Sequence, residues 1–294
     1  MVDVGGYRLN INCTGVGTPT VILDSGLGEP ALSWIGVQSG VERFTRVCSY
    51  DRAGYGHSDP GPHPRSSLQV ARELLHALLQ KSQTPGPYVL VGHSFGGYNL
   101  RVYTGLYRNE VSGIVLVDSS HEDQEQFKPA SVRDQARGLQ RLTPFVPLLR
   151  FFGVLRLRDK LQPTTVTGSK LSQAAAMQEV SALALRPNFL LAVLQEYATL
   201  GTESATQVRS AGNLWDLPLM VLTAGQATDP GNRDLDGFRK AWLEELQPSL
   251  ARLSRRGHQV VVQDSDQMTP YKNPEAIVRA IQSVWAEARH RRTN

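Results

Sequence analysis

Short apolar segments alternate along this chain with longer stretches of helical periodicity. Several of these segments are apolar throughout, as strands are when helices cover both faces of their sheet. Between them, residues 67–81 and 274–288 place apolar side chains at helical spacing. The strand-like segments are Val21–Leu23, Arg46–Tyr50, Tyr88–Val91, Ile114–Val117, Leu219–Leu222 and Val260–Val262. The repeated strand–helix order predicts an α/β fold with a mostly parallel sheet, helices on both faces and right-handed crossovers.

Local signals extend this prediction toward the two ends of the chain. Asn273 is suited to cap the last helix, and Pro274 to occupy its first position, where no amide hydrogen is needed. Near the N-terminus, Tyr7–Cys13 is typical of an additional strand pair that precedes the parallel strands.

The alternation stops between residues 121 and 215. This stretch has helical patterns only, punctuated by prolines, and residues 145–155 are its most apolar part. Parallel sheets bind ligands at the carboxyl ends of their strands, so a helical insertion here is expected to cap that edge. We therefore predict a core of residues 1–120 and 216–294 with a helical cap at 121–215. A buried helix pair without ligand contact is the alternative.

The composition is that of an ordinary globular chain, and it excludes several classes of function. Apolar residues make up 40% of the 294 residues, so a large core can form. The 31 basic and 27 acidic residues leave a net charge of +4, which is too small to indicate a nucleic-acid partner. No apolar run is long enough to span a bilayer, and no cysteine cluster has zinc-ligand spacing. Neither a metal nor an organic cofactor is implied, a membrane partner is disfavoured, and the oligomeric state stays open.

The most specific motif is the segment Val89–Gly97, in which an apolar strand runs directly into Gly-x-Ser-x-Gly and a helical pattern follows. A serine in a sharp strand-to-helix turn leaves its hydroxyl exposed, and flanking glycines remove side chains that would collide there. This context predicts that Ser94 is a nucleophile. Serines between glycines are also common in ordinary turns, which is the alternative for a bare match.

With these motifs the chain resembles the α/β-hydrolase superfamily over nearly its whole length. Asp24–Gly28 is similar to the family's oxyanion loop, and Asp51–Ser58 to its Asp-x-x-Gly-x-Gly-x-Ser signature. The resemblance implies an eight-stranded sheet with the site at its C-terminal edge. It also implies an oxyanion hole made by the backbone N–H groups of Leu27 and Phe95, with Gly26 in the tight turn that aims the first of them.

The position of the general base departs from the family's pattern. In this superfamily a histidine follows the last strand, and the matching segment here has Gln267 where that histidine would stand. A serine hydroxyl needs a base to take its proton, and a carboxamide has no useful basicity near neutral pH. Gln267 can therefore hydrogen-bond Ser94 but cannot activate it.

Three interpretations of Gln267 are open. A His→Gln substitution introduced to trap a substrate or an acyl-enzyme would leave the surroundings intact. A natural non-catalytic member would use the pocket for binding alone. In the third interpretation His121, which opens the cap near the site, is the base. Two other histidines are less suited, because His93 is expected to point away from the serine and His258 starts the last strand at its wrong end.

The resemblance leaves two candidates for the acid of the triad. Asp118 ends the strand at 114–117 and is the first choice. Asp229 follows the next strand but lies one residue further along than the common pattern, so it is the second choice. The alternatives are a strand-end residue that caps a backbone turn at Asp118 and a plain Asp-Pro turn at Asp229.

Cys13 and Cys48 each lie in a short strand-like segment. The local sequence favours two reduced, buried thiols, because cysteine is a common small core residue. The resemblance to α/β hydrolases implies instead that the two strands are neighbours, so that a disulfide forms if the register aims the side chains at each other. The localisation is open: cytoplasmic by default, and extracytoplasmic if the two cysteines are bonded.

Together these features predict a serine-nucleophile hydrolase of carboxylic esters with a hydrophobic moiety, inactive or crippled as given because of Gln267. A serine rather than an aspartate at the elbow disfavours the dehalogenase and epoxide-hydrolase branches of the superfamily. The alternative is a non-catalytic, receptor-like protein of the same fold that binds a small molecule.

Overall fold

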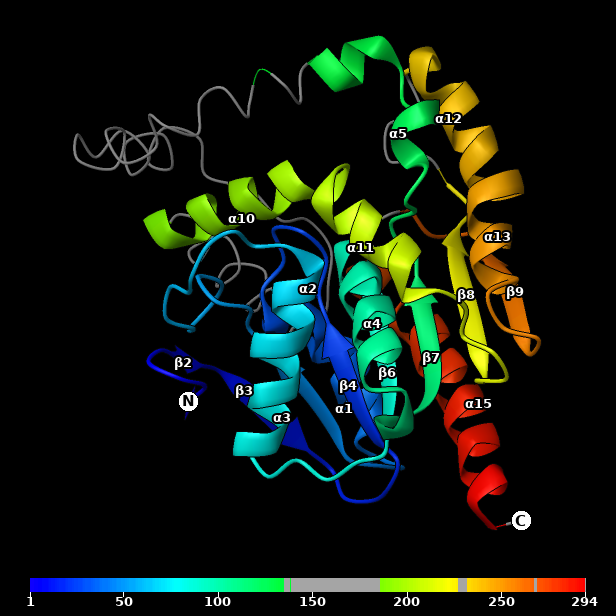
Figure 1. The fold of residues 1–294 in the computed structure, drawn as a ribbon. Coiled ribbons are helices and arrows are strands. Elements are labelled where there is room, and N and C mark those ends of the chain that lie inside the picture. Colours follow the sequence, from blue (N-terminus) through cyan, green and yellow to red (C-terminus); the bar gives the residue numbers. More distant parts are fainter. Residues whose placement is uncertain (135–137, 139–185, 227–231, 267–268, 294) are drawn as a thin grey trace.

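The computed structural model describes residues 1–134, 138, 186–226, 232–266 and 269–293 (Figure 1). In this part of the chain a seven-stranded sheet has the order β3-β5-β4-β6-β7-β8-β9, and only the β3–β5 pair is antiparallel. The strands are β1 (Val2–Asp3), β2 (Arg8–Leu9), β3 (Ile11–Thr14), β4 (Thr20–Asp24), β5 (Val47–Tyr50), β6 (Tyr88–His93), β7 (Val111–Val117), β8 (Leu219–Ala224) and β9 (Gly257–Val262). The predicted α/β class with a mostly parallel sheet is confirmed.

Helices connect these strands and pack on both faces of the sheet (Figure 1). The α-helices are α1 (Ile35–Val41), α2 (Ser67–Gln69), α3 (Ala77–Lys81), α4 (Phe95–Leu106), α5 (Gln124–Phe127), α10 (Pro187–Leu200), α11 (Glu203–Ala211), α12 (Asp236–Ala241), α13 (Gln247–Ala251), α14 (Thr269–Lys272) and α15 (Pro274–Thr293). Short 3₁₀ segments are Ala31–Trp34, Arg108–Glu110 and Arg233–Leu235, and π-helical segments are Val70–His76 and Trp242–Leu246.

The described sheet has seven strands where the resemblance implied eight, because the N-terminal strands β1 and β2 pair only with each other. Asp3 accepts hydrogen bonds from the N–H groups of Gly5 and Gly6, at 2.8 and 2.9 Å. Both glycines have positive φ, a conformation that costs glycine little. The chain therefore turns back sharply. The strand pair expected within Tyr7–Cys13 does not form there: β2 pairs with β1, and β3 joins the large sheet beside β5.

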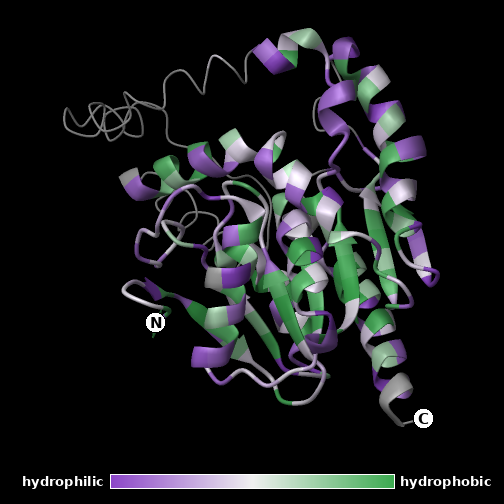
Figure 2. Ribbon diagram, in the orientation of Figure 1, coloured by the Kyte–Doolittle hydropathy of each residue, from purple (hydrophilic) through white to green (hydrophobic). Residues whose placement is uncertain are grey.

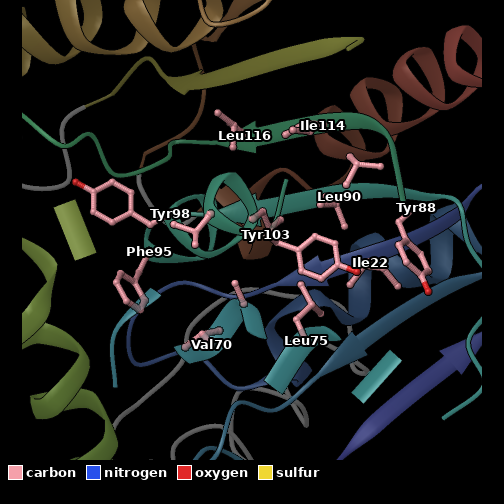
Figure 3. Close-up of a cluster of buried hydrophobic side chains, with 14 of the residues drawn as sticks. Ile22, Val70, Leu75, Tyr88, Leu90, Phe95, Tyr98, Tyr103, Ile114 and Leu116 are labelled. Carbon is pink, nitrogen blue, oxygen red and sulfur yellow. The ribbon is translucent and has the colours of Figure 1, made fainter. Parts of the chain in front are cut away.

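Alternating side chains of each central strand enter two separate apolar layers. Ile22 and Leu90 face the layer under α4, whereas Val21 and Leu23 of the same sheet face the layer under α1 and α15. Figure 3 shows the first layer, where Leu75 lies near Ile22 of β4 and Tyr103 of α4. Burial on both faces explains why these strands are continuous apolar runs, and Figure 2 shows the hydrophobic colour concentrated on them.

Both predicted helices form, with boundaries close to those expected. Residues 67–81 are helical throughout, although the middle of the stretch is a π-helix. The last helix begins at Pro274, and the Asn273 side chain accepts a hydrogen bond from the Ala276 N–H at 3.2 Å, as an N-cap does. None of the helices in the described ranges is long and apolar enough to cross a membrane.

Helix α10 runs across the edge of the sheet at which the parallel strands end (Figure 1). It is the best-described part of the predicted cap at 121–215, most of which lies outside the described residues. The next helix, α11, places Ala205 and Val208 in the apolar layer under α4. The domain boundaries stay a prediction.

Cys13 on β3 and Cys48 on β5 lie opposite each other in the antiparallel pair and form a disulfide, with Cα atoms 4.1 Å apart. The expectation of two reduced thiols is therefore wrong. The local sequence could not indicate this, because only the pairing of β3 with β5 brings the two cysteines together.

The disulfide closes a loop of 35 residues across the edge of the sheet. Replacing both cysteines by serine should lower the free energy of unfolding by about 3–4 kcal/mol, because the unfolded chain gains the freedom of that loop. Urea titration of the two proteins measures the difference. Thiol titration of the denatured, unreduced protein should find no free thiol, and two free thiols would contradict the bond.

Candidate active site

Ser94 occupies a strained turn between β6 and α4. Its φ of 48° and ψ of −116° lie in a region that non-glycine residues rarely adopt. The turn is held by the backbone: the Ser94 N–H donates to the Val117 carbonyl, and its own carbonyl accepts from Gly97 and Ser120 at 3.1 and 3.0 Å. The side chain is half-buried, so the hydroxyl is reachable at the end of a rigid strand.

The glycines of the motif allow the segments after β4 and β7 to pack closely against this turn. A Cβ on Gly96 would lie 2.3 Å from the Asp24 carbonyl oxygen, and one on Gly97 would lie 2.0 Å from the Ser119 hydroxyl oxygen. A Cβ on Gly92 would meet the backbone of Gly96 and Gly97 at 2.7 Å. The loops after β4 and β7 therefore touch the turn directly, as the predicted nucleophile elbow requires.

A cavity of about 510 Å³ opens over this turn and contains three of the predicted site residues, Leu27, Ser94 and Asp118. Its remaining lining comes from α5, α10, the end of β8 and the segment around α12. These residues are Ser120, Gln124, Lys128, Tyr197, Leu200, Ala224, Gln226, Asn232, Leu235, Asp236, Phe238, Arg239 and Trp242. The cavity combines an aromatic and aliphatic wall with four charged side chains, those of Asp118, Lys128, Asp236 and Arg239.

The loop after β4 brings Leu27 and its backbone N–H group to this cavity. The Gly26 N–H donates to the Glu29 carboxylate at 3.0 Å, and the Gly28 N–H donates to the Tyr55 hydroxyl at 3.2 Å. Between them, the Leu27 N–H has no acceptor in the described part of the chain. Phe95 is the first residue of α4, so its N–H has no acceptor within that helix.

Gly26 does not line the cavity, and a side chain at this position would point toward His93 and Glu29. A Cβ there would be 2.8 Å from the His93 ring nitrogen Nδ1 and 3.0 Å from the Glu29 carboxylate. His93 and Glu29 contact each other at 2.8 Å. Gly26 therefore lets the loop pack closely on this pair.

Asp118 ends β7 with a φ of 41° and is almost completely buried. Its Oδ1 accepts hydrogen bonds from the Trp242 indole N–H at 2.8 Å and from the Ala224 N–H at 3.2 Å. Burial raises the pKa of this carboxyl above its usual value, although the two donors oppose that effect. No feature of the sequence pointed to Trp242, because one tryptophan among helical residues is an ordinary packing residue.

The histidines of the described residues take structural positions. Nδ1 of His121 accepts the Asp123 N–H at 3.0 Å, and its Nε2 contacts the Ser249 hydroxyl at 2.6 Å. Burial lowers the pKa of His121. His258 lies at the start of β9, and none of the histidines described lines the cavity. The geometry offers no support for His121 as the base.

Gln267 and Asp229 lie outside the described residues. The segments that lead to them leave the sheet side by side, since the Gly225 N–H donates to Val262 and the Gln226 N–H to Ser265, both at 2.9 Å. Ser265 and Asp266 are buried, and the charge of Asp266 raises the pKa of Asp118. The last described residue before this gap, Asp266, therefore lies close enough to Asp118 for its charge to act on that carboxyl.

Comparisons with known proteins agree with this geometry. Residues 19–186, more than half of the chain, match the model of a family described as alpha/beta hydrolase fold. An uncharacterized vacuolar membrane protein of Saccharomyces cerevisiae is 35% identical over 134 residues, which are 40% of this chain but only 21% of that protein. The chain thus spans about a fifth of the length of this relative.

A curated enzyme and a solved structure give further matches. A 2-hydroxy-6-oxononadienedioate/2-hydroxy-6-oxononatrienedioate hydrolase of Cupriavidus pinatubonensis is 28% identical over 38% of this chain and 39% of its own. The crystal structure of a putative lipase from Acinetobacter baumannii superposes with a TM-score of 0.70 at 19% identity, covering 99% of this chain and 91% of that one. The structural match shows the fold alone.

Gly96→Ala tests the backbone contact at the turn. The added methyl group would collide with the Asp24 carbonyl, which is backbone and cannot swing away, so we expect a loss of about 1–3 kcal/mol in unfolding free energy. Gly237→Ala is the matched control, because nothing lies within 4 Å of its Cβ position on α12. Urea unfolding should show that protein unchanged or up to about 1 kcal/mol more stable. Equal stability of the two variants would contradict the contact.

Proposed function

This chain belongs to the α/β hydrolase fold family, and we propose that it is built as a serine hydrolase of carboxylic esters with Ser94 as nucleophile. The observation that supports this most is the shared cavity: the strained Ser94 turn, the Leu27 loop and the buried Asp118 meet around it. A hydroxyl, an amide near it and a buried carboxylate are the groups that acyl transfer at a serine requires at one place.

In the proposed reaction the Ser94 oxygen attacks the ester carbonyl and a tetrahedral oxyanion forms. The N–H groups of Leu27 and Phe95 would stabilise that charge, since the Leu27 N–H has no acceptor among the described residues and the Phe95 N–H lies at the start of α4. The alcohol leaves, and water then releases the acid from Ser94. Both steps need a base that accepts and returns a proton.

The proposed base position holds Gln267, which cannot perform that transfer. We therefore propose that the chain is inactive or strongly impaired as given, while its remaining parts are suited to catalysis. In this scheme Asp118 is the acid that would orient a histidine at 267.

The cavity supports an ester with a hydrophobic part. Tyr197, Leu200, Leu235, Phe238 and Trp242 supply its apolar wall. The acyl length that this cavity accepts is left to experiment.

A second candidate function is binding without turnover. It is favoured by one observation, the glutamine at the base position. In that case the cavity would hold a small molecule as a receptor does.

The disulfide between Cys13 and Cys48 supports a proposal about localisation. Such bonds persist in oxidising compartments and are rare in the cytosol. We place the protein outside the cytoplasm on that ground.

Gln267→His should raise the turnover of p-nitrophenyl esters by several orders of magnitude, since loss of a triad base costs about 10⁶ in kcat in a serine hydrolase. Initial rates on acetate to decanoate esters measure this effect and the preferred acyl length. The control is Ser94→Ala in the same background, which should return the rate to the starting level. Equally low rates with and without the histidine would favour the binding function.

The acid is tested in the Gln267→His background. Asp118→Asn should lower kcat by about 10³–10⁴, because the histidine loses its orienting carboxylate. The asparagine keeps an oxygen for the Trp242 and Ala224 donors, so the fold should be retained. Asp229→Asn is the comparison and should have a small effect. The reverse ranking would assign the acid to Asp229.

A further inference from the structure

A buried cluster of charged groups connects the cap helix α10 to the loop 24–28. Arg52 follows β5, and Glu196 lies on α10; the two form a double hydrogen bond, with both nitrogen–oxygen distances 3.0 Å. Arg65 donates to the same carboxylate at 2.7 Å, and the Tyr55 hydroxyl donates at 2.6 Å. Arg52, Arg65 and Glu196 are each at most 3% exposed.

All five N–H groups of the Arg52 guanidinium donate hydrogen bonds in this cluster. Besides the two bonds to Glu196, it donates to the Asp24 carboxylate at 2.8 Å and to the carbonyl oxygens of Ser25 and Gly26 at 2.6 and 2.8 Å. A guanidinium has five N–H groups in a fixed planar arrangement, and each has a partner here. A lysine has three donors without that planarity and could not reproduce the set.

The cluster also balances its charge inside the protein. Asp24 and Glu196 are the anions, and Arg52 and Arg65 the cations. Burial alone would raise the pKa of the Glu196 carboxyl, but Arg52 and Arg65 outweigh it and hold that pKa below its usual value. Removing one partner would leave an uncompensated buried charge, which is strongly unfavourable.

These contacts converge on the residues that flank Leu27. Arg52 binds the carbonyl groups of Ser25 and Gly26 before it, and the Tyr55 hydroxyl accepts the N–H of Gly28 after it. The Arg52 guanidinium also lies 5.7 Å from the centre of the Phe95 ring. The backbone on both sides of Leu27 is thus held by Arg52 and Tyr55.

The signature motif provides the space for this arrangement. Gly54 has a φ of 82°, and a Cβ there would lie 2.9 Å from the Ala192 Cβ and 3.1 Å from the Asn188 carbonyl on α10. Helix α10 can therefore approach closely enough for Glu196 to reach Arg52, and Phe189 packs on the Tyr55 ring beside it.

We propose that Arg52 and Glu196 are positioning residues for the loop 24–28, so that docking of α10 and correct placement of the Leu27 N–H are one event. The inference rests on the proposed role of Leu27 in ester hydrolysis. It assigns the cap helix a part in transition-state stabilisation, in addition to covering the cavity.

The test uses Arg52→Lys and Glu196→Gln, made both in the chain as given and with Gln267→His. The matched control is Arg101→Lys: Arg101 is equally buried and pairs doubly with Glu122 at 2.6 and 2.8 Å, but its described bonds do not include the loop 24–28. Tyr55→Phe is a milder variant that removes one hydroxyl from the cluster. It keeps the test available if a charge-altering variant fails to fold.

In the Gln267→His background, Arg52→Lys and Glu196→Gln should each lower kcat about 10–100-fold with little change in KM, since loss of an oxyanion donor costs about 10²–10³. The double variant should be no worse than the more damaging single one, because the two residues act as one unit. Arg101→Lys should leave kcat nearly unchanged. A kcat loss in Arg101→Lys as large as in Arg52→Lys would overturn the inference.

Hydrogen exchange on the chain as given supplies a readout that needs no activity. The amides of Gly26 and Gly28 should exchange faster in Arg52→Lys, Glu196→Gln and Tyr55→Phe than in the unchanged chain or in Arg101→Lys. Unchanged exchange in the folded cluster variants would overturn the positioning role. If Gln267→His shows no esterase activity, the proposed function fails, while exchange still decides whether Arg52 and Glu196 hold the loop.

Discussion

Close packing of the segments after β4 and β7 against the Ser94 turn is the constraint on which the site depends. The turn lies against the Asp24 carbonyl on one side and Ser119 on the other, with no room for a side chain at Gly96 or Gly97. The ends of β4 and β7 are therefore brought to Ser94 by the packing of the strands themselves. The strained φ of Ser94 persists because buried strands and α4 determine the conformation on both sides of it.

Much of the fold could be predicted because its signals are local. Val21–Leu23 and Ile114–Val117 are apolar on both faces, and the structure buries both faces. The strand-to-helix turn at Ser94 could also be predicted, because a strand, two glycines and a helix surround that serine. The separate β1–β2 pair was not, because it depends on a turn at Gly5 and Gly6 rather than on periodicity.

Partners that are distant in sequence were beyond prediction. Arg52 and Glu196 are 144 residues apart, and Trp242 reaches Asp118 across 124 residues. A glutamate on an amphipathic helix is typical of a solvent-facing position, and only the tertiary structure shows that this one is buried. The disulfide is a different case: the local sequence favoured two buried thiols, the resemblance to α/β hydrolases made the two strands neighbours, and the β3–β5 register decided the bond.

Glu196 and Asp118, two of the buried carboxylates at this edge of the sheet, have different kinds of partner, and the contrast bears on Gln267. Glu196 is paired with two guanidinium groups, which lower its pKa. Burial raises the pKa of Asp118, and this carboxylate receives hydrogen bonds from an indole and a backbone amide, which carry no charge. An aspartate in that state gains most from a cation that forms beside it during a reaction, as an imidazolium does, and a carboxamide cannot become one. Under the proposed assignment of Asp118 as the acid, these electrostatics would suit a histidine at position 267 better than the glutamine that the sequence has there.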